Sequence, residues 1–287
     1  MAIFQKAYCN YTGELSSTYA RPLVIFRYTL SSILTSRLFL SFLVVCLLPS
    51  FAIMCVIYLH YNFDTLMQLQ IPLDELVIID AEFFASYMLT PQLFFVFVLI
   101  MFIGPKLISP DFRNSALSLY ISRPISKTSY VVGKLLVLLC LGSLISWVPS
   151  TLLILFQASM ADGAWFSDNY YLILATISTS LIWIVSLSMM SLAISACVKW
   201  APVAGLSFFG IVFVGSGFGA LVSELFETWH GKLFSLFDSL EALVQASFRI
   251  EGFSEVPIDA ALLVFAAITA LSTLILYRRI RGLEVVS

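Results

Sequence analysis

The strongest constraint on this chain is a series of six apolar stretches, each long enough to cross a lipid bilayer. A membrane-spanning helix needs about 20 mostly apolar residues to cross roughly 30 Å of hydrocarbon. The six predicted spans cover residues 38–60, 87–108, 132–157, 170–197, 202–222 and 258–277. The chain is also 60% hydrophobic and only 11% charged, whereas an ordinary soluble domain carries about 25% charged residues. We therefore expect residues 1–287 to form a single all-α polytopic membrane domain.

Lys and Arg residues set the expected orientation of the spans, because cytoplasmic segments carry an excess of them. With the N-terminus inside, thirteen of the 15 Lys and Arg residues lie in inner segments, and only Lys232 and Arg249 lie outside. The acidic residues show the mirror pattern, with Glu14, Asp111 and Glu284 inside and the other fourteen of 17 outside. We therefore expect both termini in the cytoplasm, with the protein integral to a bacterial cytoplasmic (inner) membrane.

Residues 21–37, RPLVIFRYTLSSILTSR, precede the first span and have an amphipathic helical pattern. The apolar positions at helical spacing are Leu23, Phe26, Leu30, Ile33 and Leu34. Arg27 and Arg37 occupy other positions, and Pro22 suits the first turn of a helix. The pattern predicts a helix lying in the inner interface, with its Arg residues toward anionic headgroups. The alternative is an early extension of span one.

Two segments expected on the outer side, residues 61–86 and 223–257, are too long for simple turns. The second contains an apolar stripe, which predicts one or two short helices in or on the outer leaflet. The stripe consists of Leu225, Trp229, Leu233, Leu236, Leu240, Leu243 and Val244. The glycines of GSGFGA are expected to end span five, and Gly215 and Gly219 have a spacing that lets helices approach closely. We assign these two glycines to a dimer interface or transport pathway; chain flexibility before a re-entrant turn is the alternative.

The residues that several classes of function require are absent from this sequence. There is no GxxxxGK[ST] phosphate loop, because Gly133-Lys134 and Gly231-Lys232 are both followed by Leu. No His, Cys or carboxylate group has metal-ligand spacing. The interiors of the spans contain no ionisable Asp, Glu, Lys, Arg or His, which disfavours an ion-coupled transporter. We expect no catalytic residues, no metal site, no cofactor bound by this chain and no nucleic-acid partner.

Residues 109–130, between spans two and three, combine basic side chains with signals for helix ends. Ser109, Pro110 and Asp111 have the pattern of a helix start: a cap, a proline and an acid in the first turn. The pattern predicts a short cytoplasmic helix over 110–121, and Pro124 then disfavours helix at Arg123. Ser126 is expected to cap the third membrane helix.

This segment resembles the corresponding loop of type-2 ABC exporter permeases, in particular the compact six-span members. The matching features are Asp111, SALSLYISRPISK at 115–127, and Gly133-Lys134 near the start of span three. RYTLSSILTSRLFL before span one, SLAISACVKW at the end of span four and the basic C-terminus are also similar. The family commonly has Glu at the position of Asp111 and Thr at that of Ala116.

The resemblance implies a permease subunit that dimerises with an identical or related chain. Separate cytoplasmic ABC ATPase subunits would bind ATP and Mg²⁺, and residues 110–124 would form the coupling helix. The residues expected to act in this coupling are Asp111, Arg113, Arg123, Pro124, Ser126, Lys127 and Lys134. In the family, spans two and five line the dimer interface, and the segment before span six, here 223–257, forms re-entrant outer helices.

Membrane lipid and an accessory protein on the outer side are further expected partners. Two alternatives remain open. One is an ion-coupled secondary transporter or channel, and the other is an ABC-coupled membrane scaffold or mechanical transmitter without its own substrate.

Overall fold

A computed structural model of the chain describes residues 21–62, 78–114, 126–161, 163–250 and 254–281. The regular elements within these ranges are all helices, and six helical segments are long and apolar enough to span a membrane. They are Arg37–Tyr61, Ala81–Arg113, Lys127–Met160, Tyr171–Cys197, Ala201–Phe226 and Ile258–Arg279. The fold class predicted from the sequence, an all-α polytopic membrane protein, is confirmed.

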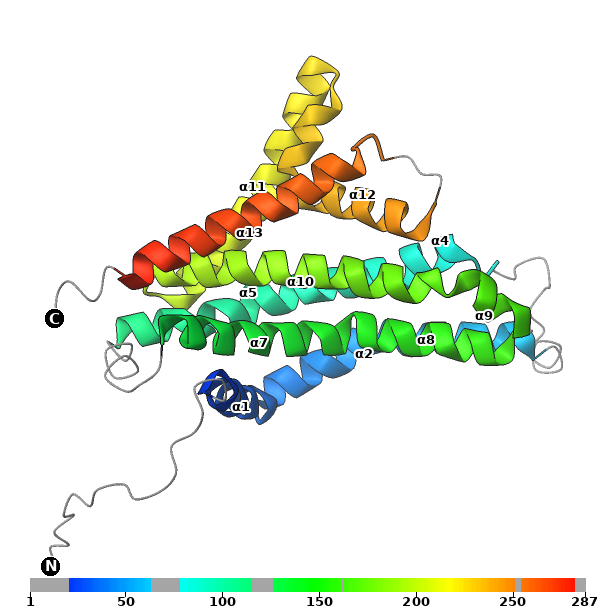
Figure 1. Cartoon of the computed structure of the whole chain (residues 1–287), viewed down its shortest axis with the longest axis horizontal. Helices are drawn as coiled ribbons and strands as arrows, with labels where there is room; N and C mark the ends of the chain where they lie inside the picture. Colours follow the sequence, from blue (N-terminus) through cyan, green and yellow to red (C-terminus); the bar gives the residue numbers. More distant parts are fainter. Residues whose placement is uncertain (1–20, 63–77, 115–125, 162, 251–253, 282–287) are drawn as a thin grey trace, which may run out of the picture.

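The spans are arranged around α10 (Tyr171–Cys197), which lies in the middle of the bundle and is the most buried of them (Figure 1). Its side chain at mid-length, Trp183, is fully buried and donates a hydrogen bond from Nε1 to the Leu93 carbonyl at 3.0 Å. The neighbours of α10 include α5 (Thr90–Arg113), α7 (Lys127–Ile145), α8 (Trp147–Met160) and α13 (Ile258–Arg281). In contrast, α2 (Arg37–Tyr61) and α11 (Ala201–Phe226) expose many of their apolar side chains.

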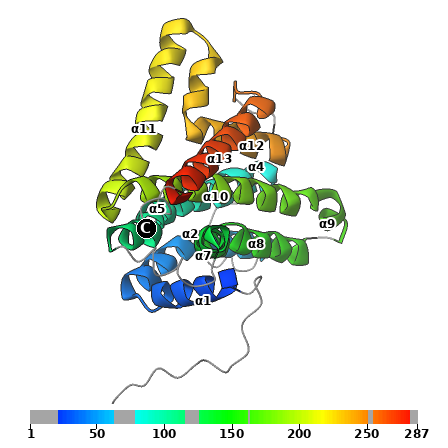
Figure 2. The ribbon, with the colours of Figure 1, turned by 60° about the vertical axis from the view of Figure 1, so that its left-hand side comes forward.

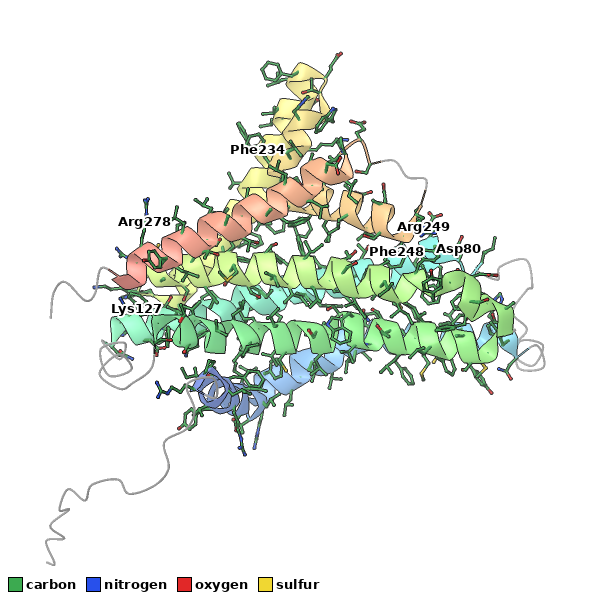
Figure 3. The ribbon with its side chains drawn as sticks, viewed as in Figure 1. Asp80, Lys127, Phe234, Phe248, Arg249 and Arg278 are labelled. Atoms are coloured by element: carbon green, nitrogen blue, oxygen red, sulfur yellow. The ribbon has the colours of Figure 1, made fainter. Side chains whose placement is uncertain are left out.

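The two ends of the bundle differ in charge. One end, here called the basic end, carries Arg113, Lys127, Lys134, Lys199 and Arg278; Figure 3 labels Lys127 and Arg278 there. The opposite end carries the short helices α4 (Ala81–Phe83) and α9 (Gly163–Asn169). Asp80 caps α4 by accepting from the Phe83 N–H at 2.8 Å. The gathering of Lys and Arg side chains at one end follows the alternation of spans that the sequence predicts, and Arg249 lies with Asp80 at the other end, as expected (Figure 3).

Helix α1 (Arg21–Leu34) is a separate element that crosses α7 steeply, since Figure 1 views α1 nearly end-on while α7 lies across the picture. The backbone is extended at Ser36, so α1 is not an extension of span one. Its inward face consists of Ile25, Phe26, Leu30 and Ile33, which pack against the bundle. Leu23 and Leu34, expected on that face, are 57% and 38% exposed, because the helix is rotated toward Ile25.

Close contact between α1 and α7 depends on Gly133. A Cβ atom at this position would lie 2.9 Å from the Pro22 carbonyl oxygen and 3.0 Å from the Ile25 Cβ. We therefore expect Gly133→Val to displace α1, measured as faster hydrogen–deuterium exchange over residues 21–34. Gly210→Val is the matched control, because a Cβ at Gly210 meets nothing within 4 Å. Unchanged exchange in the Gly133 variant would contradict the contact.

The predicted helix start at Ser109-Pro110-Asp111 is wrong, because α5 continues through these residues to Arg113. Ser195 of α10 contacts the backbone of α5 between its two prolines, Pro105 and Pro110. Its Oγ accepts from the Ser109 N–H at 2.9 Å and donates to the Pro105 carbonyl at 2.9 Å. These two backbone groups are a normal i, i+4 pair, so the hydroxyl is placed in the hydrogen-bond ladder of α5. The predicted helix over 110–121 otherwise lies outside the described residues.

The third span consists of two helices, α7 and α8, which meet at Ser146 with φ −97° and ψ −93°. Pro149 follows three residues later, and its missing N–H removes a helical hydrogen bond. The Ser146 hydroxyl donates to the Gly142 carbonyl at 2.8 Å, and Ser150 Oγ donates to the Ser146 carbonyl at 2.9 Å. The two hydroxyl groups thus add hydrogen bonds to backbone carbonyls on either side of the break.

The glycines of GSGFGA do not end span five, because α11 continues past them to Phe226. The chain then turns at Glu227, which has φ 49°, and returns along α11 as the 3-10 helix η4 (Trp229–Phe234). Figure 2 shows this return as a hairpin projecting from the bundle. A Cβ at Gly219 would lie 2.5 Å from the Gly231 carbonyl oxygen, and one at Gly215 would lie 2.9 Å from that of Phe234. The close approach predicted for Gly215 and Gly219 thus occurs with η4 of the same chain.

Helix α12 (Leu236–Phe248) follows η4 and packs against α10 and α13. It buries Leu236, Leu240, Leu243 and Val244 of the predicted stripe, together with Phe248. Leu225 does not belong to that face, because it lies on α11 and is 77% exposed. The prediction of short helices before the last span is confirmed for η4 and α12.

Candidate functional site at the basic end of the bundle

The sequence-predicted site residues that the structure brings together are Asp111 of α5 and Lys134 of α7. Lys134 Nζ lies 3.3 Å from Asp111 Oδ2. The hydroxyl of Tyr130, also on α7, donates to the same carboxylate oxygen at 2.6 Å. Lys134 Nζ lies 5.6 Å from the centroid of the Tyr130 ring. The three side chains form a compact polar cluster, here called the Asp111 cluster.

The Asp111 cluster is shielded from water. The Lys134 side chain is 8% exposed and that of Asp111 is 19% exposed, and Tyr130 is buried. An opposite charge at this distance interacts more strongly in a poorly hydrated setting than on a surface. The carboxylate also accepts a phenolic hydrogen bond, which satisfies part of its remaining capacity. The cluster is therefore a structural link between α5 and α7, with both charges compensated.

Local sequence explains why two residues of α7 face the same carboxylate. Ser126 caps α7, since its Oγ accepts from the Ser129 N–H at 3.1 Å, which confirms the predicted cap. Tyr130 and Lys134 then lie four residues apart, and so share one face of the helix. Asp111 lies in the last turn of α5, which reaches this level only because α5 continues beyond Pro110.

Apolar contacts hold five helices together beside the Asp111 cluster. A buried group of side chains at this end comes from α1, α5, α7, α10 and α13. Its members are Ile25, Leu107, Ile108, Tyr130, Leu138, Met189, Leu192, Ala193, Ala196 and Leu276. Ser109 Oγ adds a hydrogen bond to the Ser195 carbonyl at 3.0 Å. The basic end is therefore a continuous, packed unit in which α1 and α5 are both fixed to α7.

The other predicted site residues have separate positions. Arg113 lies outside the Asp111 cluster, with its guanidinium carbon 5.9 Å from the centroid of the Trp200 ring. Lys127 occupies the first position of α7. Arg123 and Pro124 lie outside the described residues, and Gly215 and Gly219 are in the projecting hairpin. Asp111 and Lys134, which the resemblance predicts to act in ATPase coupling, are paired with each other in the structure.

Sequence reasoning missed Tyr130, Ser195 and Trp200 at this end. The spacing of Tyr130 four residues before Lys134 was a usable signal for the first. Ser195 and Trp200 come from the end of α10 and the following turn, so their proximity to α5 depends on tertiary structure. Among the described residues there is no group of three or more His, Cys, Asp or Glu side chains that could hold a metal ion.

Comparisons with family models and with curated proteins find no match for this chain. The case for a function therefore depends on the residues of the basic end and on the resemblance of the loop between α5 and α7.

Proposed function

We propose that this chain is the transmembrane permease subunit of an ATP-driven ABC exporter. It would dimerise with an identical or related permease chain and couple to separate cytoplasmic ATPase subunits. The basic end would be cytoplasmic, with both termini on that side, because Lys and Arg concentrate in cytoplasmic segments. ATP and Mg²⁺ would be bound by the ATPase subunits.

The observation that supports this proposal best is the part-buried ion pair between Asp111 and Lys134. These residues lie close to the two ends of the segment that connects α5 and α7, and this segment contains the loop motif SALSLYISRPISK. A force applied to the connecting segment would reach both helices together, because the Asp111 cluster holds them at a fixed separation. Coupling by a partner ATPase requires such a stiff base, since a flexible one would absorb the movement.

The link continues from the basic end into the membrane. Ser195 fixes α10 to α5 at the level of Pro105, and Trp183 fixes it again at Leu93. Deeper still, the Gln92 side chain donates to Ser50 of α2 and accepts from Ser150 of α8. A displacement of α5 would therefore be transmitted to α2, α8 and α10 through hydrogen bonds between helices. This connectivity is what a mechanically coupled permease needs.

Purification of the chain with its native partners tests the proposal. We expect an ABC ATPase subunit to co-purify, and vanadate to inhibit both ATP hydrolysis and transport by the complex. Absence of an ATPase together with vanadate-insensitive activity would overturn the proposal. Ion-dependent transport by the isolated chain in liposomes would instead support the secondary transporter or channel.

Replacement of Arg123 and Pro124 tests the loop directly. We expect Arg123→Ala/Pro124→Ala to reduce transport at least tenfold while ATP hydrolysis and membrane insertion persist, because the restriction that a proline places on its own φ and on the residue before it would be removed. The measurements are transport and ATP hydrolysis by the reconstituted complex. Arg278→Ala is a matched control, since it removes an exposed basic side chain from the same end. Normal coupling in the double variant would count against a lever in this loop.

A further inference from the structure

A pocket opens at the basic end between the end of α5 and the turn from α10 to α11. Its volume is about 420 Å³, which lies within the range of about 300–1,000 Å³ found for small-molecule sites. Two prolines, Pro110 and Pro202, form part of its wall. The polar lining comes from Arg113, Asn114 and Lys199, and the indole of Trp200 completes it. The pocket is distinct from the Asp111 cluster, which lies on the α7 side of α5.

The pocket has two positive charges and no carboxylate among its lining residues. Asp111 lies near Arg113 in sequence, but it is already paired with Lys134 and Tyr130. Arg113 has a described contact only with the Trp200 ring. The segment 115–125 between the described parts adds no acidic residue, since Arg123 is its single charged side chain. An anion in the pocket would therefore meet two cations whose charge is not compensated by the described lining residues.

The lining residues of the pocket also offer hydrogen-bond donors to an anion. Arg113 offers a planar guanidinium, the group best suited to phosphate oxygens, and Lys199 offers an ammonium. The Asn114 amide can add a further N–H donor. The first turn of α11 begins at Ala201, so the positive end of the helix dipole lies at the pocket wall.

Trp200 indicates the depth of the pocket in the membrane. It lies between two spans, α10 and α11, and its side chain is 63% exposed. Tryptophan is enriched at membrane–water interfaces, where the ring lies among the headgroups. The pocket thus opens at headgroup level, where anionic lipid is abundant and basic pockets between membrane helices bind lipid headgroups.

We propose that this pocket binds the phosphate of an anionic phospholipid headgroup from the leaflet at the basic end. Arg113 and Lys199 hold the phosphate oxygens, Asn114 donates to the headgroup, and Trp200 packs beside the glycerol region. This assignment does not rest on the proposed transport function, because it concerns the chain alone.

Lipid binding to the purified full-length chain tests the assignment. Native mass spectrometry would follow titration of detergent-solubilised protein with phosphatidylglycerol, and with phosphatidylcholine for comparison. We expect the unaltered chain to bind phosphatidylglycerol in preference to phosphatidylcholine. Arg113→Gln or Lys199→Gln should weaken phosphatidylglycerol binding about fivefold, and the double variant should weaken it about 25-fold. These factors correspond to roughly 1 kcal/mol for each cation removed. Arg278→Gln, at the same end but outside the pocket, should change the affinity less than twofold.

A second titration with inorganic phosphate separates lipid from a free anion. If phosphate alone binds with the same dependence on Arg113 and Lys199 and phosphatidylglycerol shows no preference, the ligand is a soluble anion and the lipid assignment is wrong. Equal lipid binding by the double variant and the unaltered chain would also overturn it. If the double variant keeps its lipid but loses an acidic partner protein, the pocket is a protein-docking site instead.

Discussion

Lys134→Met should destabilise the chain by about 1–3 kcal/mol, the usual cost of leaving a polar group inside the protein without its partner. Among the described residues, the Asp111 carboxylate would then keep the Tyr130 hydroxyl as its partner, and its own side chain is 19% exposed. An uncompensated buried charge costs more than the pair contributed, so the loss exceeds that of an ordinary surface substitution. The free energy of unfolding of the purified chain, from a denaturant titration in mixed micelles, measures the effect.

A double variant separates the cost of the orphaned charge from the value of the pair. Asp111→Asn/Lys134→Met removes both charges and keeps a group that can accept from Tyr130. We expect it to recover most of the lost stability, because apolar or neutral replacements of buried pairs are often nearly neutral. Lys106→Met is the matched control, since Lys106 is exposed on α5 and its loss should stay within about 0.5 kcal/mol. If the double variant is as unstable as Lys134→Met, the uncompensated Asp111 charge is not the cause of the lost stability.

The spans could be predicted from sequence because their signal is local. An apolar run of about 20 residues already specifies a membrane helix, without knowledge of its neighbours. The expected core of every span lies inside a long helix of the structure. Ser126 was also predictable as a cap, because an N-cap depends on residues within one turn.

The helix end near Asp111 was not predictable, because its determinant is distant in sequence. Ser-Pro-Asp is a good local start signal, yet α5 continues through it to Arg113. Ser109 instead packs against α10, where Ser195, 86 residues away, accepts from its backbone N–H. The same holds for the candidate site. Charge patterning placed Asp111 and Lys134 at one end of the bundle, but their contact requires the relative register of α5 and α7. The sequence therefore indicates which residues gather at an end, and tertiary structure decides which of them meet.

Gly219→Ala should destabilise the hairpin of α11 and η4 by about 1–3 kcal/mol, the range for overfilling a packed contact. The added Cβ would lie 2.5 Å from the Gly231 carbonyl oxygen, a backbone atom that cannot rotate away. The helix propensity gained by replacing glycine, about 1 kcal/mol, offsets only part of this cost. The measurement is the unfolding midpoint of the purified chain, with proteolysis near η4 as a local readout.

Gly217 provides the matched control, because it lies two residues away on the same helix and a Cβ there meets nothing within 4 Å. Gly217→Ala should raise stability by up to about 1 kcal/mol, from helix propensity alone. Gly231→Ala should reproduce the loss from the other side, since its Cβ would lie 2.5 Å from the Gly219 carbonyl oxygen. The two losses should not add, because both result from one displaced contact. If Gly219→Ala abolishes dimer formation but leaves the unfolding midpoint unchanged, Gly219 acts at an interface between chains and not within this hairpin.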